Sequence, residues 1–144
     1  MIKYNVNYED WNGNERTDVC RFNINEVELR QLNAKYGGNL DTYFARIYQE
    51  KDEKAMMDFV LDVMRLAYGV MDDDGVHFRK SEKVWEDWVS SPSFEKFFVS
   101  TMASDVESGK FIKGVLPAKL REAVNDDDAT AKLKVLQAAD VTLS

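Results

Sequence analysis

The sequence predicts a mainly α-helical α+β fold, in which an N-terminal β-hairpin packs on a bundle of about five to seven short helices. Three observations support this class. Apolar and polar residues alternate at the N-terminus, as they do in a half-buried strand. From residue 25 onward, apolar residues recur with the spacing of amphipathic helices. The chain has 144 residues, 44% of them hydrophobic, and is therefore long enough to bury one core.

The hairpin is predicted from residues 2–21. Ile2, Tyr4, Val6 and Tyr8 alternate with polar residues. Asn12-Gly13 then favours a two-residue type I′ turn, because both turn positions need positive φ. Centring the turn there predicts these cross-strand pairs: Tyr8–Thr17, Val6–Val19 and Tyr4–Arg21 on the buried face, and Glu9–Arg16 on the other face.

Helix signals dominate after the hairpin. Asn25 and Glu28 form a capping-box pair, and Gly37-Gly38 ends that helix near Tyr36. Met71–Lys80 is expected to be a polar loop. The remaining predicted helices and their signals are 40–48, 53–68, 84–89 after a Ser81 cap, 92–102 with Ser91 as cap and Pro92 at the first position, and 105–116 with Asp105 as cap.

The segment 53–68 is apolar nearly all round, with only a narrow stripe of Asp58, Asp62 and Arg65. Such a helix is buried on most sides, either as the central helix or partly as an oligomer interface. One domain usually has one core, which favours the central position. We therefore expect a single compact domain over 1–120, with the hairpin in 1–24 and helices in 25–120. An acidic linker and a loosely attached helix are expected in 121–144.

Composition narrows the functional classes. The formal net charge of −7 gives a surface that repels phosphate backbones and anionic lipids, so direct binding to nucleic acid or to a membrane is disfavoured. A single cysteine allows no intramolecular disulfide. No secretion signal and no membrane-spanning run is recognisable. These features predict a soluble, intracellular protein that is not secreted.

The sequence offers little for catalysis. The only histidine, His77, falls in a polar loop and Cys20 in a strand, so a nucleophile–base pair is not expected. Two such side chains are too few for structural zinc. An EF-hand aligned on Gly75 fails at both ends of its loop, at Val70 and Ser81, which leaves a solvated acidic turn. We predict no enzyme, no metal and no cofactor.

Several segments, taken in order, resemble one group of tail assembly chaperones from long-tailed, siphovirus-like bacteriophages or prophages of Gram-positive hosts. The resemblance covers about residues 1–120. Its most specific part is Leu66-Ala67-Tyr68-Gly69 followed by Asp73 to Ser81. The other matching segments are Ile2-Lys3-Tyr4, Tyr8-Glu9-Asp10, Asn12 to Glu15, Phe22-Asn23-Ile24, Gly37-Gly38, Val84 to Val89, Ser90-Ser91-Pro92, Phe94 to Met102 and Phe111 to Pro117. The departures are Val76 and His77, where basic residues are commoner in the family, and the chain after Leu120, which has no match.

The resemblance implies a factor that is absent from the mature virion and acts in the cytoplasm of the infected or lysogenic host. It would hold the tape measure protein while the major tail protein polymerises around it, with the major tail protein as a further candidate partner. Self-association is also left open. Two apolar helix faces and a tryptophan pair are the candidate partner-binding residues: Phe59, Val60, Val63, Met64, Trp85, Trp88, Phe94, Phe97, Phe98 and Met102. Core packing is the competing interpretation of both tryptophans.

Two other binding functions compete with the chaperone hypothesis. An acidic inhibitor that mimics DNA would present its carboxylates in two regularly spaced rows. A minor structural component would remain in the virion. A chaperone instead requires apolar surface that suits a helical, hydrophobic partner.

Overall fold

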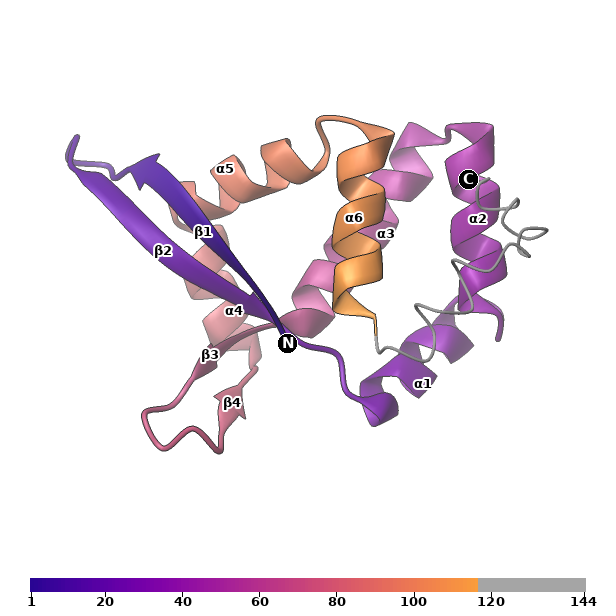
Figure 1. The fold of residues 1–144 in the computed structure, drawn as a ribbon, viewed down its shortest axis with the longest axis horizontal. Coiled ribbons are helices and arrows are strands. Elements are labelled where there is room, and N and C mark those ends of the chain that lie inside the picture. Colours follow the sequence, from indigo (N-terminus) through magenta and orange to yellow (C-terminus); the bar gives the residue numbers. More distant parts are fainter. Residues whose placement is uncertain (117–144) are drawn as a thin grey trace.

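The computed structural model describes residues 1–116 as a four-stranded antiparallel sheet with six helices (Figure 1). The predicted fold class is therefore confirmed. The strands are β1 (Ile2–Glu9), β2 (Glu15–Phe22), β3 (Tyr68–Met71) and β4 (Phe78–Arg79). The helices are α1 (Glu26–Lys35), α2 (Leu40–Glu50), α3 (Glu53–Ala67), α4 (Glu82–Val89), α5 (Pro92–Thr101) and α6 (Asp105–Val115). The predicted linker and helix in 121–144 lie outside the described residues.

The hairpin forms, but the predicted register is wrong by one residue. Tyr8 lies opposite Arg16, and Val6 opposite Asp18. Only Gly13 in the loop has positive φ, because the loop is a three-residue turn closed by Gly13 N–H to the Asp10 carbonyl (3.0 Å). The Asp10 carboxylate also accepts from the Asn12 and Asn14 amides, which stabilises this longer turn.

In the observed register, the face of β2 that points to the core is the opposite of the predicted one. The core face of β2 carries the buried side chains Cys20 and Phe22, whereas Val19, predicted to be buried, is 48% exposed. The alternation predicted for β1 is confirmed, with Val6 buried and Ile2, Tyr4 and Tyr8 half-buried. The predicted Glu9–Arg16 pair is wrong, because Glu9 faces Glu15 and Arg16 pairs with Asp10 at 2.8 Å.

The expected polar loop at 71–80 is partly a second hairpin, and that prediction is corrected. The α3 helix runs directly into β3, which pairs with β2 on one side and β4 on the other. The sheet order is β1-β2-β3-β4, so β1 lies at one edge. Two- and four-residue strands are too short to show a period-two pattern, which explains why sequence reasoning missed them.

The predicted caps mostly form. Asn25 and Glu28 make both hydrogen bonds of the capping box at α1, and the Ser81 hydroxyl accepts from the Val84 amide at α4. Ser91 occupies the cap position before Pro92 but makes no capping bond with its side chain. The predicted Asp105 cap is wrong, because Ser104 caps α6 and Asp105 is its first residue.

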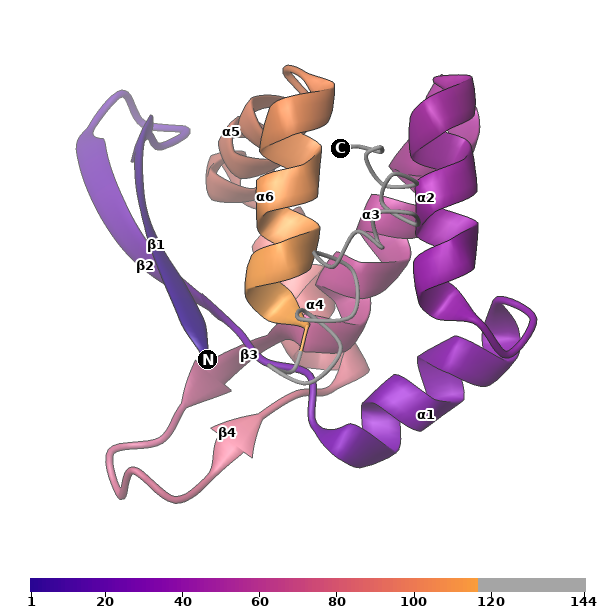
Figure 2. The same ribbon diagram turned by 45° about the vertical axis from the view of Figure 1, so that its right-hand side comes forward.

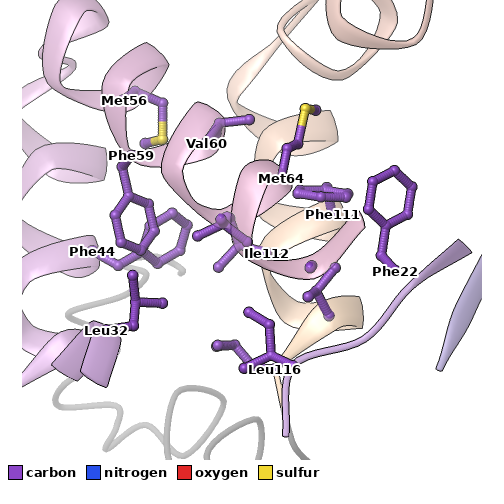
Figure 3. Close-up of a cluster of buried hydrophobic side chains, with 14 of the residues drawn as sticks. Phe22, Leu32, Phe44, Met56, Phe59, Val60, Met64, Phe111, Ile112 and Leu116 are labelled. Carbon is purple, nitrogen blue, oxygen red and sulfur yellow. The ribbon is translucent and has the colours of Figure 1, made fainter. Parts of the chain in front are cut away.

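The α3 helix lies at the centre of the helical part, as predicted (Figures 1 and 2). Its core-facing side chains lie between those of α2 and α6, and Figure 3 shows this cluster. Beside it, Phe22 of β2 stacks on Phe97 of α5 (5.1 Å between centroids) and meets Phe111 of α6 edge to face (5.2 Å). One continuous core therefore joins the sheet to the helices. No helix within residues 1–116 is long and apolar enough to cross a bilayer.

Candidate partner-binding surfaces

Most of the predicted binding residues lie inside the monomer. Phe59, Val60, Val63 and Met64 have no exposed surface, because α3 is covered on most sides. Trp85, Trp88 and Phe97 are 9%, 4% and 6% exposed. Both tryptophans therefore lie in the core, as the core-packing interpretation predicts. These seven side chains support the surface from the core and contribute little exposed area of their own.

The other three predicted residues form a half-buried row along α5 and its C-cap residue, Met102. Phe94, Phe98 and Met102 follow at intervals of four, and the Phe94 and Phe98 rings stack at 5.7 Å. Phe94 also meets the edge of Trp85, at 5.8 Å. We call these three residues the α5 row. Their part in binding stays a prediction.

A larger concave surface lies on the outward side of α3. Two adjoining hollows of about 740 and 440 Å³ share Asp62, Arg65 and Trp85 and so form one groove. Its walls come from α1, α2, α3 and α4. We call it the α3 groove. Its apolar and aromatic lining residues are Leu32, Tyr36, Tyr43, Ala55, Leu61, Leu66 and Trp85.

Charges of both signs line the same groove. Lys35 pairs with Asp62 at 2.9 Å, and the Arg65 guanidinium pairs with Glu82 and lies 5.8 Å from the centre of the Trp85 ring. The Tyr36 hydroxyl donates to Asp62. Burial, and then this hydrogen bond to a carboxylate, raise the pKa of Tyr36, so the phenol stays protonated. The groove can thus receive an amphipathic surface that carries both apolar and charged groups.

Sequence reasoning missed this groove although a signal for it was present. Asp58, Asp62 and Arg65 form the narrow polar stripe of the otherwise apolar segment, and all three line the groove. The stripe marks the one side of α3 that reaches solvent. Its neighbours Leu61 and Leu66 are half-buried rather than sealed.

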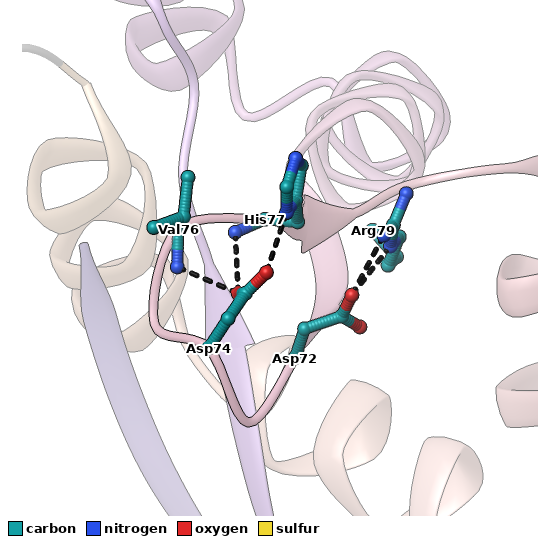
Figure 4. Close-up of polar contacts among 5 residues, drawn as sticks. All are labelled: Asp72, Asp74, Val76, His77 and Arg79. Atoms are coloured by element: carbon teal, nitrogen blue, oxygen red, sulfur yellow. Dashed lines mark hydrogen bonds and ion pairs between the residues drawn. The ribbon is translucent and has the colours of Figure 1, made fainter.

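The acidic segment 72–77 is a tight turn between β3 and β4 (Figure 4). Asp74 accepts from the Val76 amide (2.8 Å), the His77 amide (3.1 Å) and the His77 ring (2.7 Å). Asp72 accepts from Arg79 at 2.8 Å. These bonds, the Val76 amide first for Asp74, lower the pKa values of both carboxyls.

Asp72, Asp74 and His77 also bring three potential metal-ligand atoms within 4.8 Å of one another. The protein's own donors already bond all three side chains, which fits the predicted acidic turn. Cys20 lies elsewhere, buried in β2, where its sulfur contacts Ser93 Oγ at 3.8 Å. Burial raises the pKa of this thiol, so it is a poor nucleophile. The structure does not join Cys20 and His77 into a catalytic pair.

The most specific segments of the sequence resemblance meet around Lys80, and we call this contact region the Lys80 joint. The Lys80 ammonium donates to the carbonyls of Asn23 (2.7 Å) and Leu66 (3.0 Å) and to the Glu28 carboxylate (2.6 Å). A Cβ at Gly69 would lie only 2.8 Å from the carbonyl oxygen of Arg79. The Lys80 joint holds the end of α3, the start of α1 and β4 together. Because Lys80 and Glu28 also line the α3 groove, these contacts fix the position of one end of the groove.

Comparison with known proteins confirms the phage tail assembly chaperone family and corrects the extent of the match, which continues beyond Leu120. No curated protein and no solved structure matches the chain. A model of the family described as phage tail assembly chaperone matches residues 1–143, which is nearly the whole sequence. The chain therefore belongs to the phage tail assembly chaperone family.

Proposed function

We propose that the protein binds the tape measure protein of a long-tailed, siphovirus-like phage or prophage of a Gram-positive host. It keeps that protein soluble while the tail tube polymerises, with the major tail protein as a further partner. It acts in the host cytoplasm and is absent from the mature virion. The role is one of binding, with no catalysis. Family membership supports the assembly role, and the α3 groove is the observation that carries the binding mode.

The groove suits a helix with an apolar face. A bound amphipathic helix would place apolar side chains against Leu61, Leu66 and the exposed part of Trp85. Its flanking charges would meet the acidic and basic side chains that line the groove. A tape measure protein, as a long helical chain, exposes such faces before the tube encloses it. The net charge of −7 keeps the resulting complex soluble.

A matched pair of variants tests the groove. Leu61→Asp puts a charge on the half-buried apolar floor of the groove. Val99→Asp also replaces an aliphatic side chain by a carboxylate, but on α5, where Val99 is 61% exposed. Each variant is co-expressed with the tape measure protein of the same phage or prophage and recovered by affinity pull-down. We expect Leu61→Asp to reduce recovery about tenfold or more, as the loss of a central apolar contact does, and Val99→Asp to leave it unchanged.

Circular dichroism and thermal unfolding of each variant establish that the fold is retained. Leu61→Ser provides a milder change if the aspartate variant is unfolded. Equal recovery of the tape measure protein with folded groove variants and with wild type would remove the α3 groove from the proposal. Recovery that falls instead with Phe98→Asp would move the binding site to the α5 row.

A further inference from the structure

The β1 strand is an edge strand of the sheet. It is eight residues long and lies at the end of the sheet order, paired with β2 alone among the described residues. It contains no proline, and no bulge interrupts its pairing with β2. Such an edge is a template for another strand unless it is covered or disfavoured. A hollow of about 390 Å³, bounded by β1, α5 and α6, adjoins it.

The hairpin register decides which backbone groups of β1 are free. Asp10 N–H bonds the Asn14 carbonyl at 2.8 Å, so the even-numbered residues direct their backbone groups toward β2. The odd-numbered residues, from Lys3 to Glu9, therefore direct theirs to the side away from β2. Their side chains are exposed on the outer face of the sheet. A strand added here must pair with the odd positions.

The outer face has an uneven charge pattern. Lys3 lies directly opposite Arg21, and Glu9 lies directly opposite Glu15. Both are like-charge pairs, which oppose hairpin formation. None of these four side chains forms an ion pair within residues 1–116. One end of the hairpin thus carries two positive charges and the other end two negative charges.

We propose that a second copy of this chain pairs with the β1 edge, antiparallel and centred on Val6. That register places Lys3 opposite Glu9 of the second copy, and Asn5 opposite Asn7. It joins odd residues to odd residues, as the free backbone groups require. It also aligns the positive end of each hairpin with the negative end of the other. The two-fold axis repeats each pair, so the interface is self-complementary.

The same edge could in principle receive a strand from another protein. The second copy is favoured because its sequence supplies the opposite charge at both ends in the one register that uses the whole strand. Lys3 alone would be an ordinary edge-protecting charge, and Glu9 six residues further on makes the pattern reciprocal. This inference does not depend on the tape measure proposal.

Charge exchange tests the pairing. Sedimentation of the full chain between about 1 and 500 µM should show a concentration-dependent dimer, because a single strand interface is small. Lys3→Glu or Glu9→Lys alone converts both attractive pairs into repulsive ones and should raise the dimer dissociation constant about tenfold to a hundredfold. The double variant, with both changes, should restore dimerisation. Glu86→Lys on the exposed surface of α4 makes the same charge change as Glu9→Lys and should have no effect.

Amide exchange gives a second readout that concerns the backbone directly. The amides of Asn5 and Asn7 should become protected as the protein concentration rises, whereas that of Val6 is already bonded in the hairpin. A wild-type chain that stays monomeric over the whole range overturns the proposal. So does an oligomer that neither single variant weakens, or one that the double variant fails to restore.

Discussion

At Gly69 the structure leaves no space for a side chain. A Cβ there would lie 2.8 Å from Arg79 O and 2.8 Å from Lys80 Cγ, and one of these two atoms belongs to the backbone and cannot rotate away. We expect Gly69→Ala to lower the free energy of unfolding by about 1–3 kcal/mol through overpacking. Urea denaturation measures the change.

Gly109 provides the matched control for that substitution. It lies within α6, and a Cβ there would meet only Tyr48, at an ordinary contact distance of 3.9 Å. Gly109→Ala should raise the free energy of unfolding by about 0.5–1 kcal/mol, since alanine favours a helix. If both variants unfold like wild type, the close packing of β3 on β4 is contradicted.

Asp10 should make the hairpin sensitive to acid. The Asn14 amide, and then the Arg16 guanidinium, hold the pKa of this carboxyl below its ordinary value of 3.8. The Asp10 carboxylate therefore binds a proton more readily in the unfolded chain than in the folded one. The stabilisation that the charged carboxylate gives to the fold is present above pH 3.8 and is lost as the pH falls through the pKa of the folded state.

Asp10→Asn tests this pH dependence. The variant should be less stable than wild type at pH 7, and the difference should shrink as the pH falls below 3.8. Urea denaturation at several pH values measures it, with Asp73→Asn as a control on an exposed carboxylate. A difference that stays constant down to the lowest pH would show that the charge of Asp10 is not what stabilises the turn.

Among contacts between elements, the Lys80 joint should contribute strongly to stability, because the Lys80 side chain is only 18% exposed. Lys80→Met leaves the Asn23 and Leu66 carbonyls and the Glu28 carboxylate without this donor. We expect a loss of about 1–3 kcal/mol in the free energy of unfolding. Lys83→Met, which removes only an exposed pair with Asp87, should cost no more than about 0.5 kcal/mol. Equal effects of the two substitutions would contradict the joint.

Glu9 and Glu15 form an unfavourable like-charge pair in the hairpin, and one substitution can remove it. Glu15→Lys replaces the like pair with Glu9 by an opposite pair and should stabilise the monomer by about 0.2–1 kcal/mol. Thermal unfolding at low protein concentration measures this. No gain in stability would indicate that the two carboxylates splay apart in solution.

The same elements show which structural features could be predicted. Caps and helix ends depend on neighbours in the sequence, so Asn25, Ser81 and Gly37-Gly38 predicted boundaries well. The hairpin register depended on one side chain, Asp10, whose three acceptor contacts favour a longer turn than Asn12-Gly13 alone indicates. The short strand β3 depends on pairing with β2, and β4 on pairing with β3, and no local pattern records either pairing.

Over the whole molecule, periodicity identified apolar faces but not their direction. The same spacing describes a face that enters the core and one that binds a partner. Phe59, Val60, Val63 and Met64 therefore fit the pattern of a binding face, although the structure buries them. The groove beside them depends on four helices meeting, so only its polar stripe was visible in the sequence. Family membership then supplies the function that geometry alone would leave open.

We propose that this protein shields an aggregation-prone helical partner through the α3 groove. The most direct measurement is the soluble fraction of the tape measure protein when it is expressed alone, with the wild-type chain, and with Leu61→Asp. We expect the soluble fraction of the tape measure protein to rise with the wild-type chain and to fall back with the folded Leu61→Asp variant. A tape measure protein that is equally soluble in all three cases would contradict it.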